Sequence, residues 1–553
     1  MIDAPAGTGK TFTEKCLASR LRGEDKVVLI VASTGIAALQ LPGGWTAHSM
    51  FKLPMDDNLT PSCVCNISSQ TQRAELIRQS NLIIWDELPM THRYCVEALD
   101  RTLKDLMAVD QPFGGKTILF SGDWRQTGPI VKNAAPTDTV DAAFISSPLW
   151  KGVMRFRLNK SQRDKEDPQY ASFVRSIGEG SRPTVTMSDG SKLTPLNNHD
   201  NEDTANHFQL RYTTDFDELL RFVYPDLSQQ SRIWNTRAIL ATTNHSIDRS
   251  NDTISDNRPG NYVSFFSSDS LISDEKNRRT AFASPEHLNQ LNVQGIPPHE
   301  LKLKTDTLAL ITRNLNFSEG LVNGQKCVVL AVSASSRVLQ VQLLTEERPR
   351  PIVLIPRINF QGKVGRNGIC FTRKQFPLRT AYSMTINKSQ GQTLSKIGLD
   401  LRSSPFAHGQ LYVALSRSQN RTSIMCLLPD THIIDGIPYT DNIVYPPLIQ
   451  AATFGDYHPG NSISGSVGGD KDTQSCDGDE ESVDDADKDD TDSVDDSDND
   501  DANADSLGSW TVLDEIGDGA CMLRCVSRYI YGSPITHRVS ETYVTPHCIL
   551  HEP

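Results

Sequence analysis

The first 150 residues alternate short apolar runs with polar or amphipathic segments. The runs at 26–32, 81–85 and 116–120 are rich in β-branched residues and predict buried strands, whereas apolar residues recur at helical spacing over 96–107. Strands that alternate with helices build a parallel sheet with right-handed crossovers, and ligands bind at the carboxyl ends of its strands. We therefore predict an α/β domain over residues 1–150 with a binding site at that edge.

The pattern changes twice beyond residue 150. Residues 151–300 are mixed and include a polar stretch at 188–204 that we predict to be a loop. Residues 301–380 are typical of a small β-barrel, because short β-like runs follow one another between Gly, Asn and Pro; the runs are 308–312, 326–332, 338–344 and 351–355. Residues 381–457 return to strand–helix alternation, so the β-rich segment interrupts a second α/β region.

The segment at 458–505 differs from the rest of the chain in composition. It is rich in Gly, Ser and Asp and has almost no large apolar side chains. Such a segment cannot bury enough surface to offset chain entropy, so we predict a disordered acidic linker. Ordinary composition returns over 506–553.

The charge balance divides the chain at the same place. The 553 residues include 55 basic and 68 acidic side chains, a net charge of −13. Residues 470–505 carry 18 acidic side chains and 2 lysines, and residues 506–553 carry 5 acidic side chains and 3 arginines, which leaves residues 1–469 at about +5. The acidic average therefore does not exclude a nucleic-acid partner for the larger part of the chain.

Other totals restrict the environment that the chain suits. No apolar run approaches the ~20 residues that a membrane helix needs, and the first residues lack the basic and apolar regions of a signal peptide. The 11 cysteines form no C-x-x-C pair. We expect reduced thiols in the cytosol or nucleus.

A phosphate-binding loop is predicted at residues 4–11, Ala-Pro-Ala-Gly-Thr-Gly-Lys-Thr, with Ala4 in place of the usual first Gly. Small residues allow backbone N–H groups to turn inward around phosphates; these are the groups of Ala6, Gly7, Thr8, Gly9, Lys10 and Thr11. The Lys10 side chain would reach the β- and γ-phosphates of ATP, and the Thr11 hydroxyl would bind Mg²⁺. A flexible glycine-rich loop is the alternative, which the Lys-Thr pair disfavours.

Two carboxylates end the apolar strand at 81–85. Asp86 would hold Mg²⁺, and Glu87 would polarise the attacking water, which indicates hydrolysis and not binding alone. The block at 122–126 follows the next apolar strand, and Gln126 within it could sense the γ-phosphate. A polar surface turn is the alternative for that block.

Further blocks continue the pattern in a fixed order. They lie at 32–38, 44–51, 237–244, 284–289, 295–304, 313–315, 320–324, 385–393 and 408–417. Together with the phosphate loop and Asp86-Glu87, they resemble superfamily-one DNA helicases of the Pif (petite integration frequency) family, especially the copies in Helitron transposons. The resemblance covers about residues 1–450.

The resemblance implies an α/β fold with two RecA-like P-loop domains, at 1–150 and at 151–300 with 381–457, and an SH3-like β-barrel insert at 301–380. It implies ATP with Mg²⁺ between the two domains. It further implies 5'–3' translocation on single-stranded DNA and at duplex junctions. The family acts in DNA repair, recombination, telomere maintenance or transposition, and the nucleus is the expected location, with the mitochondrion second.

The same resemblance assigns residue roles. Arg163 and Arg417 match the family's catalytic arginines, and Gln390 matches a nucleotide contact. The family's DNA-contacting positions fall on Thr34, Thr46, His48, Ser49 and Lys388. An ordinary, partly buried histidine is the alternative for His48.

Some further DNA contacts stay open between two interpretations. Trp45 and Phe51 could stack on bases or could pack within their own motif. The basic residues of the β-rich insert could line the DNA path or form a solvated face; they are Arg357, Lys363, Arg366, Arg373, Lys374 and Arg379.

Two departures from the family pattern favour a second hypothesis. Only three residues precede Ala4, so the first strand would be short and the segment with the family's adenine-contacting Gln is not in this sequence. Trp124 and Gly128 also differ from the usual residues. The alternative function is therefore a catalytically impaired, nucleic-acid-binding remnant of a transposon helicase.

The last 48 residues resemble the start of an ovarian-tumour-type cysteine protease at 510–524 and 526–532. The resemblance implies Cys521 as the nucleophile and Asp518 as the support of its turn. Only 32 residues follow Cys521, and none of their histidines has the family's context. We expect a truncated fragment without protease activity.

Overall fold

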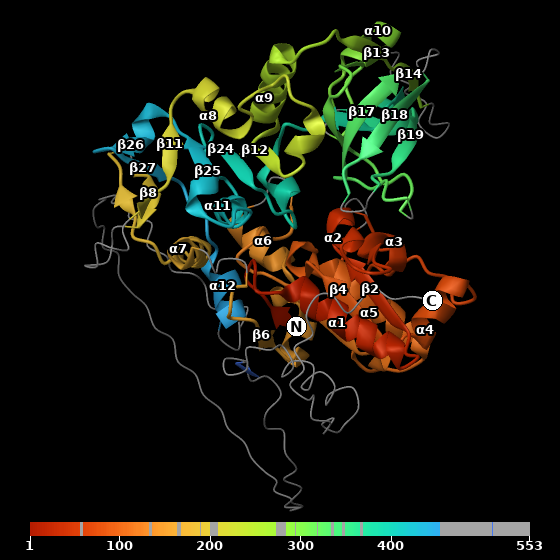
Figure 1. Ribbon diagram of the computed structural model, residues 1–553. Helices are drawn as coiled ribbons and strands as arrows, with labels where there is room; N and C mark the ends of the chain where they lie inside the picture. The colour runs from red at the N-terminus through yellow and green to blue at the C-terminus, as the bar shows by residue number, and fades with distance from the viewer. Residues whose placement is uncertain are drawn as a thin grey trace, which may run out of the picture.

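The computed structural model describes most of the chain before residue 454 (Figure 1). The described residues are 1–55, 59–131, 135–162, 167–188, 190–198, 208–272, 284–293, 295–317, 319–332, 337–345, 349–364, 369–453 and 511–512. Figure 1 shows three adjoining parts: a first sheet with its helices, in red and orange, a second in yellow, teal and blue, and a β-rich part in green.

The first part is built on a parallel sheet of seven strands in the order β28-β6-β1-β5-β4-β2-β3. These strands are β1 (Ile2–Asp3), β2 (Val28–Ala32), β3 (Trp45–Thr46), β4 (Leu82–Asp86), β5 (Ile118–Gly122), β6 (Phe156–Arg157) and β28 (Thr511–Val512). The three predicted strands are confirmed as β2, β4 and β5. Strand β1 pairs with both β5 and β6, so its two residues lie inside the sheet.

Helices cover both faces of this sheet. Alternate residues of β2 enter two different cores: Leu29 and Val31 join one with α5 (Arg93–Met107), while Val28 and Ile30 join another with α1 (Lys10–Gly23). Successive strand residues point to opposite faces, so both faces are packed. The helix expected over 96–107 is confirmed as α5. The shorter helices here are α2 (Gly35–Leu39), α3 (Ala47–Phe51), α4 (Gln72–Gln79) and α6 (Pro136–Ala142).

The second part contains a parallel sheet of five strands in the order β11-β25-β24-β12-β23. These are β11 (Arg211–Thr213), β12 (Arg237–Ala241), β23 (Ser383–Thr385), β24 (Lys396–Asp400) and β25 (Ile424–Leu427). Its helices include α7 (Pro168–Glu179), α8 (Phe216–Val223), α9 (Asn244–Asn257) and α11 (Gln410–Leu415). Helix α12 (Pro446–Thr453) instead packs through Leu448 and Ala451 into the core of the first part. Because β12 pairs with β23 and β24, segments on either side of the β-rich insertion form one sheet.

The β-rich part consists of antiparallel strands. Its largest sheet has the order β19-β18-β17-β16-β22, from β16 (Leu308–Ile311), β17 (Lys326–Val332), β18 (Val338–Leu343), β19 (Ile352–Pro356) and β22 (Leu378–Thr380). Smaller sheets pair β13 (Val263–Phe266) with β15 (Glu300–Leu303), and β14 (Ser268–Leu271) with β21 (Ile369–Gln375) and β20 (Ile358–Val364). The four predicted β-like runs are confirmed as β16, β17, β18 and β19.

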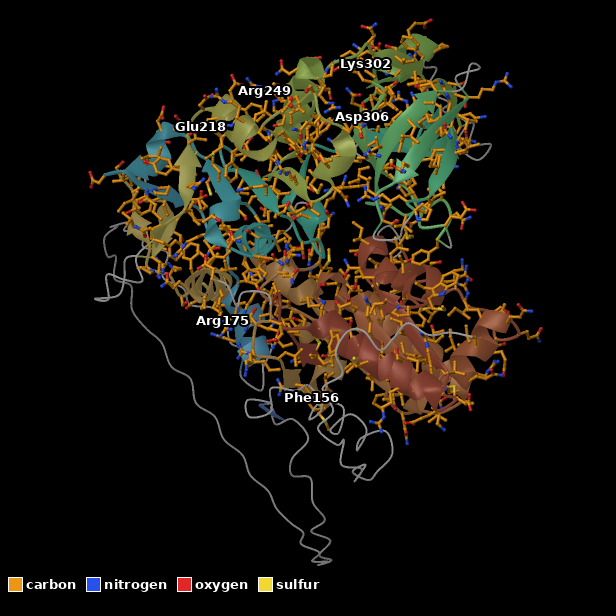
Figure 2. All side chains as sticks on the ribbon, in the orientation of Figure 1. Phe156, Arg175, Glu218, Arg249, Lys302 and Asp306 are labelled. Atoms are coloured by element: carbon orange, nitrogen blue, oxygen red, sulfur yellow. The ribbon has the colours of Figure 1, made fainter. Side chains whose placement is uncertain are left out.

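Asp306 joins the β-rich part to the second sheet domain (Figure 2). Its carboxylate lies 2.8 Å from the guanidinium of Arg258 and accepts a hydrogen bond from the backbone of Ser231. Arg258 stands over the ring of Trp234, 4.9 Å from its centroid. Buried polar contacts of this kind fix how one part sits on the next.

Several expectations were wrong. The stretch at 188–204 is not all loop, because it contains β8 (Lys192–Pro195) and β9 (Asn197–Asn198). Strand β8 pairs with β27 (Ile437–Thr440), a partner far away in the sequence. For Phe51, the second of the two interpretations holds: its side chain packs within the protein, fully buried against Trp85, and does not stack on bases. Arg373 lies on no solvated face or DNA path, because it is buried with Asp269 at 2.7 Å.

Other expectations fall outside the described residues. The acidic linker at 458–505 is one of them, and so are Arg163, Arg366 and nearly all of 506–553. The sheet of the first part continues past the expected domain boundary at residue 150, because β6 (Phe156–Arg157) pairs with β1. The β-rich part begins before the expected boundary at residue 301, with β13 (Val263–Phe266). Among the described residues, none of the helices has the length and apolar character needed to span a bilayer.

Candidate nucleotide and nucleic-acid site

The loop at residues 4–11 runs from the carboxyl end of β1 into α1. Gly7 and Gly9 have φ of +83° and +90°, the left-handed region that glycine adopts without strain. The backbone N–H of Ala4 donates to Gly122 O at 2.9 Å, and the Thr8 hydroxyl donates to Pro5 O at 2.7 Å. The loop is thus fixed to β5 and begins a helix N-terminus that favours anions.

Lys10 lies between the two predicted carboxylates. Its Nζ is 2.6 Å from Asp86 Oδ1 and 2.6 Å from Glu87 Oε1. Burial disfavours the charged amine, but Asp86 and Glu87 outweigh it and raise the pKa of Lys10 above its usual value. The parallel order of β1, β4 and β5 explains why Lys10 lies against these carboxylates. The three strands end at the same edge of the sheet, so the loop after β1 and the carboxylates after β4 lie close together.

Glu87 has a backbone conformation and a pKa that are typical of a catalytic carboxylate. Its backbone has φ of +56°, a strained conformation for a residue with a side chain. Burial raises the pKa of Glu87, while Lys10 opposes the shift. A carboxylate with a raised pKa is a stronger base toward a water molecule.

Arg417 reaches this site from the second sheet domain. It is 3% exposed, and its guanidinium donates to the backbone oxygens of Val413 and Gln392 and to Ser416 Oγ. Its positive charge also acts on the Glu87 carboxyl, where it opposes the rise in pKa that burial causes. Lys10 and Glu87 are thus in direct contact, and Arg417 acts on Glu87 through its charge.

The block at 122–126 forms the contact between the two sheet domains. The Gln126 amide donates to Asp123 Oδ2 at 3.2 Å, and the next residue, Thr127, donates to Gln390 Oε1 at 2.9 Å. The other amide atoms, Gln126 Oε1 and Gln390 Nε2, are buried without a hydrogen-bond partner among the described residues. Buried amide atoms without partners fit a nucleotide site, because a bound nucleotide would supply the missing hydrogen bonds.

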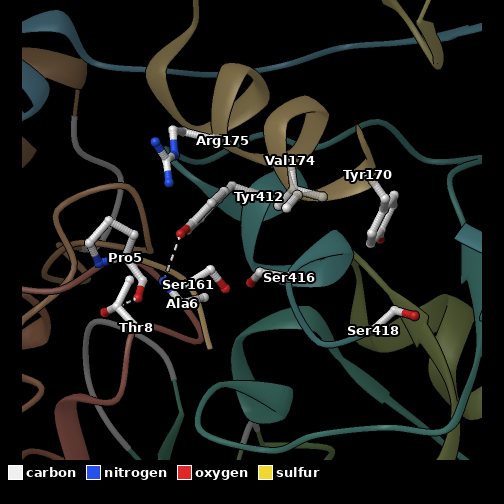
Figure 3. Close-up of a pocket in the computed structure, with 11 residues that line it drawn as sticks. Pro5, Ala6, Thr8, Ser161, Tyr170, Val174, Arg175, Tyr412, Ser416 and Ser418 are labelled. Carbon is white, nitrogen blue, oxygen red and sulfur yellow. Dashed lines mark hydrogen bonds between the residues drawn. The ribbon is translucent and has the colours of Figure 1, made fainter. Parts of the chain in front are cut away.

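Tyr412 of α11 also bridges the domains (Figure 3). Its hydroxyl accepts from the backbone N–H of Ala6 at 3.0 Å and donates to Asp123 Oδ2 at 2.8 Å. Burial raises the pKa of Tyr412, and Asp123 adds to the shift, so the hydroxyl keeps its proton. The ring packs on Gly178, where a Cβ would come within 2.6 Å of it. The sequence block contained Tyr412 but gave no sign of this partner.

A small cavity that is open to solvent lies beside Tyr412 and the phosphate loop. Figure 3 shows its lining: Pro5, Ala6 and Thr8 from the loop, Tyr170, Val174 and Arg175 from α7, and Ser416 and Ser418 beyond α11. Its mixed apolar and polar walls are typical of small-molecule sites.

The predicted DNA-contacting residues divide into two groups. Thr34 and Thr46 precede α2 and α3, at the carboxyl ends of β2 and β3, and His48 and Ser49 are exposed on α3. Thr34 caps α2 through a hydrogen bond from the backbone N–H of Ala37. These four residues thus share one edge of the first sheet domain.

Lys388 belongs to the second sheet domain. It lines a small, open pocket together with Arg379 and Thr385. Burial lowers the pKa of Lys388, and Arg379 lowers it further, while Asp248 opposes the shift. A half-buried lysine beside a second cation suits an anionic ligand.

Two side chains had no place in the sequence prediction. Glu14 and Ser121 are both buried behind Asp86, and the Ser121 hydroxyl contacts both carboxyl groups. A polar residue one helical turn after Lys10 was the only available signal. Of the predicted site residues, Arg163, Asp518 and Cys521 lie outside the described residues.

Comparison with known families gives this geometry a context. A family model described as PIF1-like helicase matches residues 2–188, and one described as the 2B domain of DNA helicase Pif1 matches residues 286–332. The first match contains the phosphate loop, Asp86, Glu87 and the block at 122–126.

Curated relatives extend the likeness. The ATP-dependent DNA helicase PIF1 of Candida albicans is 24% identical over 474 residues, covering 76% of this chain and 51% of the relative. The human protein of the same name is 26% identical over 424 residues, covering 76% and 57%. This chain spans about half of the length of these relatives.

Solved structures share the fold. The crystal structure of Bacteroides Pif1 bound to ssDNA has a TM-score of 0.54 and 23% identity, covering 77% of this chain and 88% of that one. Pif1 helicase from Candida albicans has a TM-score of 0.54 and 24% identity, covering 77% and 90%. This chain is therefore a mixed α/β protein whose fold, with its parallel sheets, is similar to that of the Pif1 helicase structures.

Proposed function

We propose that this protein is an ATP-dependent DNA helicase that translocates 5'–3' on single-stranded DNA by hydrolysing Mg-ATP. The observation that carries the proposal is the contact of Lys10 with Asp86 and Glu87 at the phosphate loop, to which the charge of Arg417 from the second sheet domain is added. A site divided between two domains can couple a nucleotide state to their relative motion. The relatives named above are ATP-dependent DNA helicases, and a related Bacteroides Pif1 was crystallised with ADP-AlF3 and ssDNA.

Each site residue receives a role in this proposal. The loop amides of Ala6, Gly7, Thr8 and Gly9 and the Lys10 ammonium bind phosphates, and Thr11 and Asp86 hold Mg²⁺. When bound, the metal neutralises phosphate charge. Glu87 orients and deprotonates water, and Gln126 and Gln390 sense the nucleotide with amide atoms that otherwise lack partners. Arg417 and Arg163 supply positive charge to the phosphoryl group.

The cavity beside Tyr412 would receive the base and ribose. It adjoins the phosphate loop, and its apolar residues Pro5 and Val174 offer stacking surface. Strand β1, although two residues long, pairs on both sides. Both features favour a working ATPase over the alternative, an impaired nucleic-acid-binding remnant.

Single-stranded DNA would cross the edge that carries Thr34, Thr46, His48 and Ser49 and continue to Lys388. Trp45, 42% exposed and stacked on Phe317, is a further candidate at this edge. Duplex junctions would meet the β-rich part, which we propose to be the SH3-like insert. Action in repair, recombination, telomere maintenance or Helitron transposition, and residence in the nucleus, would follow from a DNA substrate.

A purified-protein assay tests the proposal. ATP hydrolysis should rise with single-stranded DNA, and a duplex with a 5' tail should unwind while one with a 3' tail should not. Lys10→Ala should abolish nucleotide binding and hydrolysis, whereas Glu87→Gln should keep binding and lose hydrolysis. Arg417→Ala should lower kcat by about 10³-fold.

The control is Lys15→Ala, because Lys15 lies on the exposed side of the same helix. It should leave hydrolysis unchanged. A wild-type protein that binds single-stranded DNA but never hydrolyses ATP would instead support the remnant.

A further inference from the structure

Glu14 is a buried carboxyl group beside the phosphate loop, and the proposed chemistry gives it no part. It lies on α1 one turn after Lys10 and is 0% exposed. Its Oε2 has no hydrogen-bond partner among the described residues. Burial of an unpartnered polar atom costs stability, and a leucine of similar size would pack here without that cost. A buried carboxyl group that lowers the stability of the fold points to a role of Glu14 in the site.

The Ser121 hydroxyl connects Glu14 to Asp86. Ser121 Oγ is hydrogen-bonded to Glu14 Oε1 and lies 3.1 Å from Asp86 Oδ1. The same Asp86 oxygen accepts from the backbone N–H of Glu87 at 2.8 Å and contacts Lys10 Nζ at 2.6 Å. Three donors thus hold one oxygen of Asp86 and orient its other oxygen.

The hydroxyl has only one proton to share between two carboxyl groups. Both contacts are satisfied when protonated Glu14 donates to Ser121 Oγ and Ser121 donates to Asp86 Oδ1. Burial raises the pKa of Glu14 well above its usual range, and the nearby charge of Asp86 adds to the shift. A protonated, neutral Glu14 can donate to Ser121, as this order of hydrogen bonds requires.

We propose that Glu14 is a positioning residue that acts through the Ser121 hydroxyl to fix the Asp86 carboxylate for Mg²⁺. The inference rests on the proposed function, in which Asp86 holds the metal. Groups that orient a metal ligand from behind change metal affinity without touching the metal.

The experiment compares Glu14→Leu, Glu14→Gln and Ser121→Ala with the full wild-type chain. Glu14→Leu and Ser121→Ala should raise the Mg²⁺ concentration for half-maximal ATPase activity about 10-fold. Glu14→Gln can still donate to Ser121 through its amide and should stay near the wild type. The double variant should be no worse than either single variant, because both changes break one path.

A stability measurement separates positioning from packing. Glu14→Leu removes an unpartnered buried carboxyl, so its melting temperature should rise while its use of Mg²⁺ weakens. A merely structural residue would lower both together. Ser80→Ala is the control, since Ser80 is a buried serine of the same domain whose hydroxyl donates to Ile77 O; its Mg²⁺ dependence should not change.

Two results would overturn the proposal. One is an unchanged Mg²⁺ dependence in Glu14→Leu. The other is an equal rise in the Mg²⁺ requirement in Glu14→Gln and Glu14→Leu. Binding of Mn²⁺ with ADP, followed by electron paramagnetic resonance, gives a readout that needs no hydrolysis. Absent ATPase activity in the wild type would contradict the proposed function alone. Equal Mn²⁺ affinity of the wild type and Glu14→Leu would contradict the role of Glu14.

Discussion

The imidazole Nε2 of His408 lies 2.8 Å from the backbone oxygen of Trp124, which is 284 positions earlier in the chain. The Nδ1 atom of the same ring accepts from the backbone N–H of Tyr445 at 2.9 Å, so the proton of the neutral ring is on Nε2 and donates to Trp124. This contact fixes the second sheet domain against the block at 122–126, next to Tyr412 and the phosphate loop.

The His408 contact should make stability depend on pH. Burial lowers the pKa of His408 from 6.5 to about 4. The unfolded chain therefore takes up a proton first as pH falls, and the stability that neutral His408 provides is complete above pH 6.5 and is lost as pH falls toward 4. His408→Gln keeps a donor and an acceptor without titrating. The wild type should lose roughly 3 kcal/mol relative to this variant across the window.

Urea unfolding at several pH values checks this prediction. The exposed His287 provides the control, because His287→Gln should leave the pH dependence of the wild type intact. Parallel curves for the wild type and His408→Gln would contradict it.

Gly409 should be essential for the contact between the domains. Its φ is +71°, and a Cβ at this position would lie 2.3 Å from the backbone oxygen of Arg125. Gly409→Ala must move α11 away from the first domain, and a misplacement of about 1 Å can cost ~10²-fold in rate. We expect a comparable fall in ATPase kcat. Gly436→Ala is the matched control, since Gly436 has φ of +77° but open space around it.

Lys326 should destabilise the protein at neutral pH. Burial lowers its pKa to about 8, and its ammonium donates to Asn235 O at 2.7 Å. Because the folded pKa lies below the unfolded value of 10.5, the penalty is complete below pH 8 and disappears as pH rises toward 10.5. Lys326→Met should therefore raise the free energy of unfolding at pH 7 and gain less at pH 10. The exposed Lys302→Met should change little; equal gains at both pH values would contradict the assignment.

The ion pair of Arg373 and Asp269 should be costly to break. The two side chains are 0% and 1% exposed and lie 2.7 Å apart, and Arg373 also donates to the backbone oxygens of Leu288 and Pro297. Asp269→Asn leaves a buried guanidinium without its counter-charge, which costs about 3–5 kcal/mol. Asp248→Asn, in the exposed pair with Arg379, should cost less than about 1 kcal/mol. Equal losses in thermal unfolding would contradict the difference in burial.

The sequence by itself determined the local parts of this protein. The phosphate loop, the strand that ends in Asp86-Glu87 and the amphipathic helix over 96–107 are contiguous patterns, and each follows from the backbone and burial needs of neighbouring residues. The order of motifs also placed Arg417 and Gln390 at the nucleotide site. Their roles stay predictions, although Gln390 contacts Thr127 across the two domains and the charge of Arg417 acts on Glu87.

Only the tertiary structure decided the contacts between distant segments. The hydroxyl of Tyr412 on Ala6 and Asp123, the ring of His408 on Trp124, and Glu14 behind Asp86 join positions with no shared local pattern. The burial of Arg373 is of the same kind, because a basic residue on a strand looks identical in sequence whether it faces water or a buried aspartate. Local propensity depends on a few neighbouring residues. Packing depends on which helices and strands come into contact, and interactions along the whole chain determine those contacts.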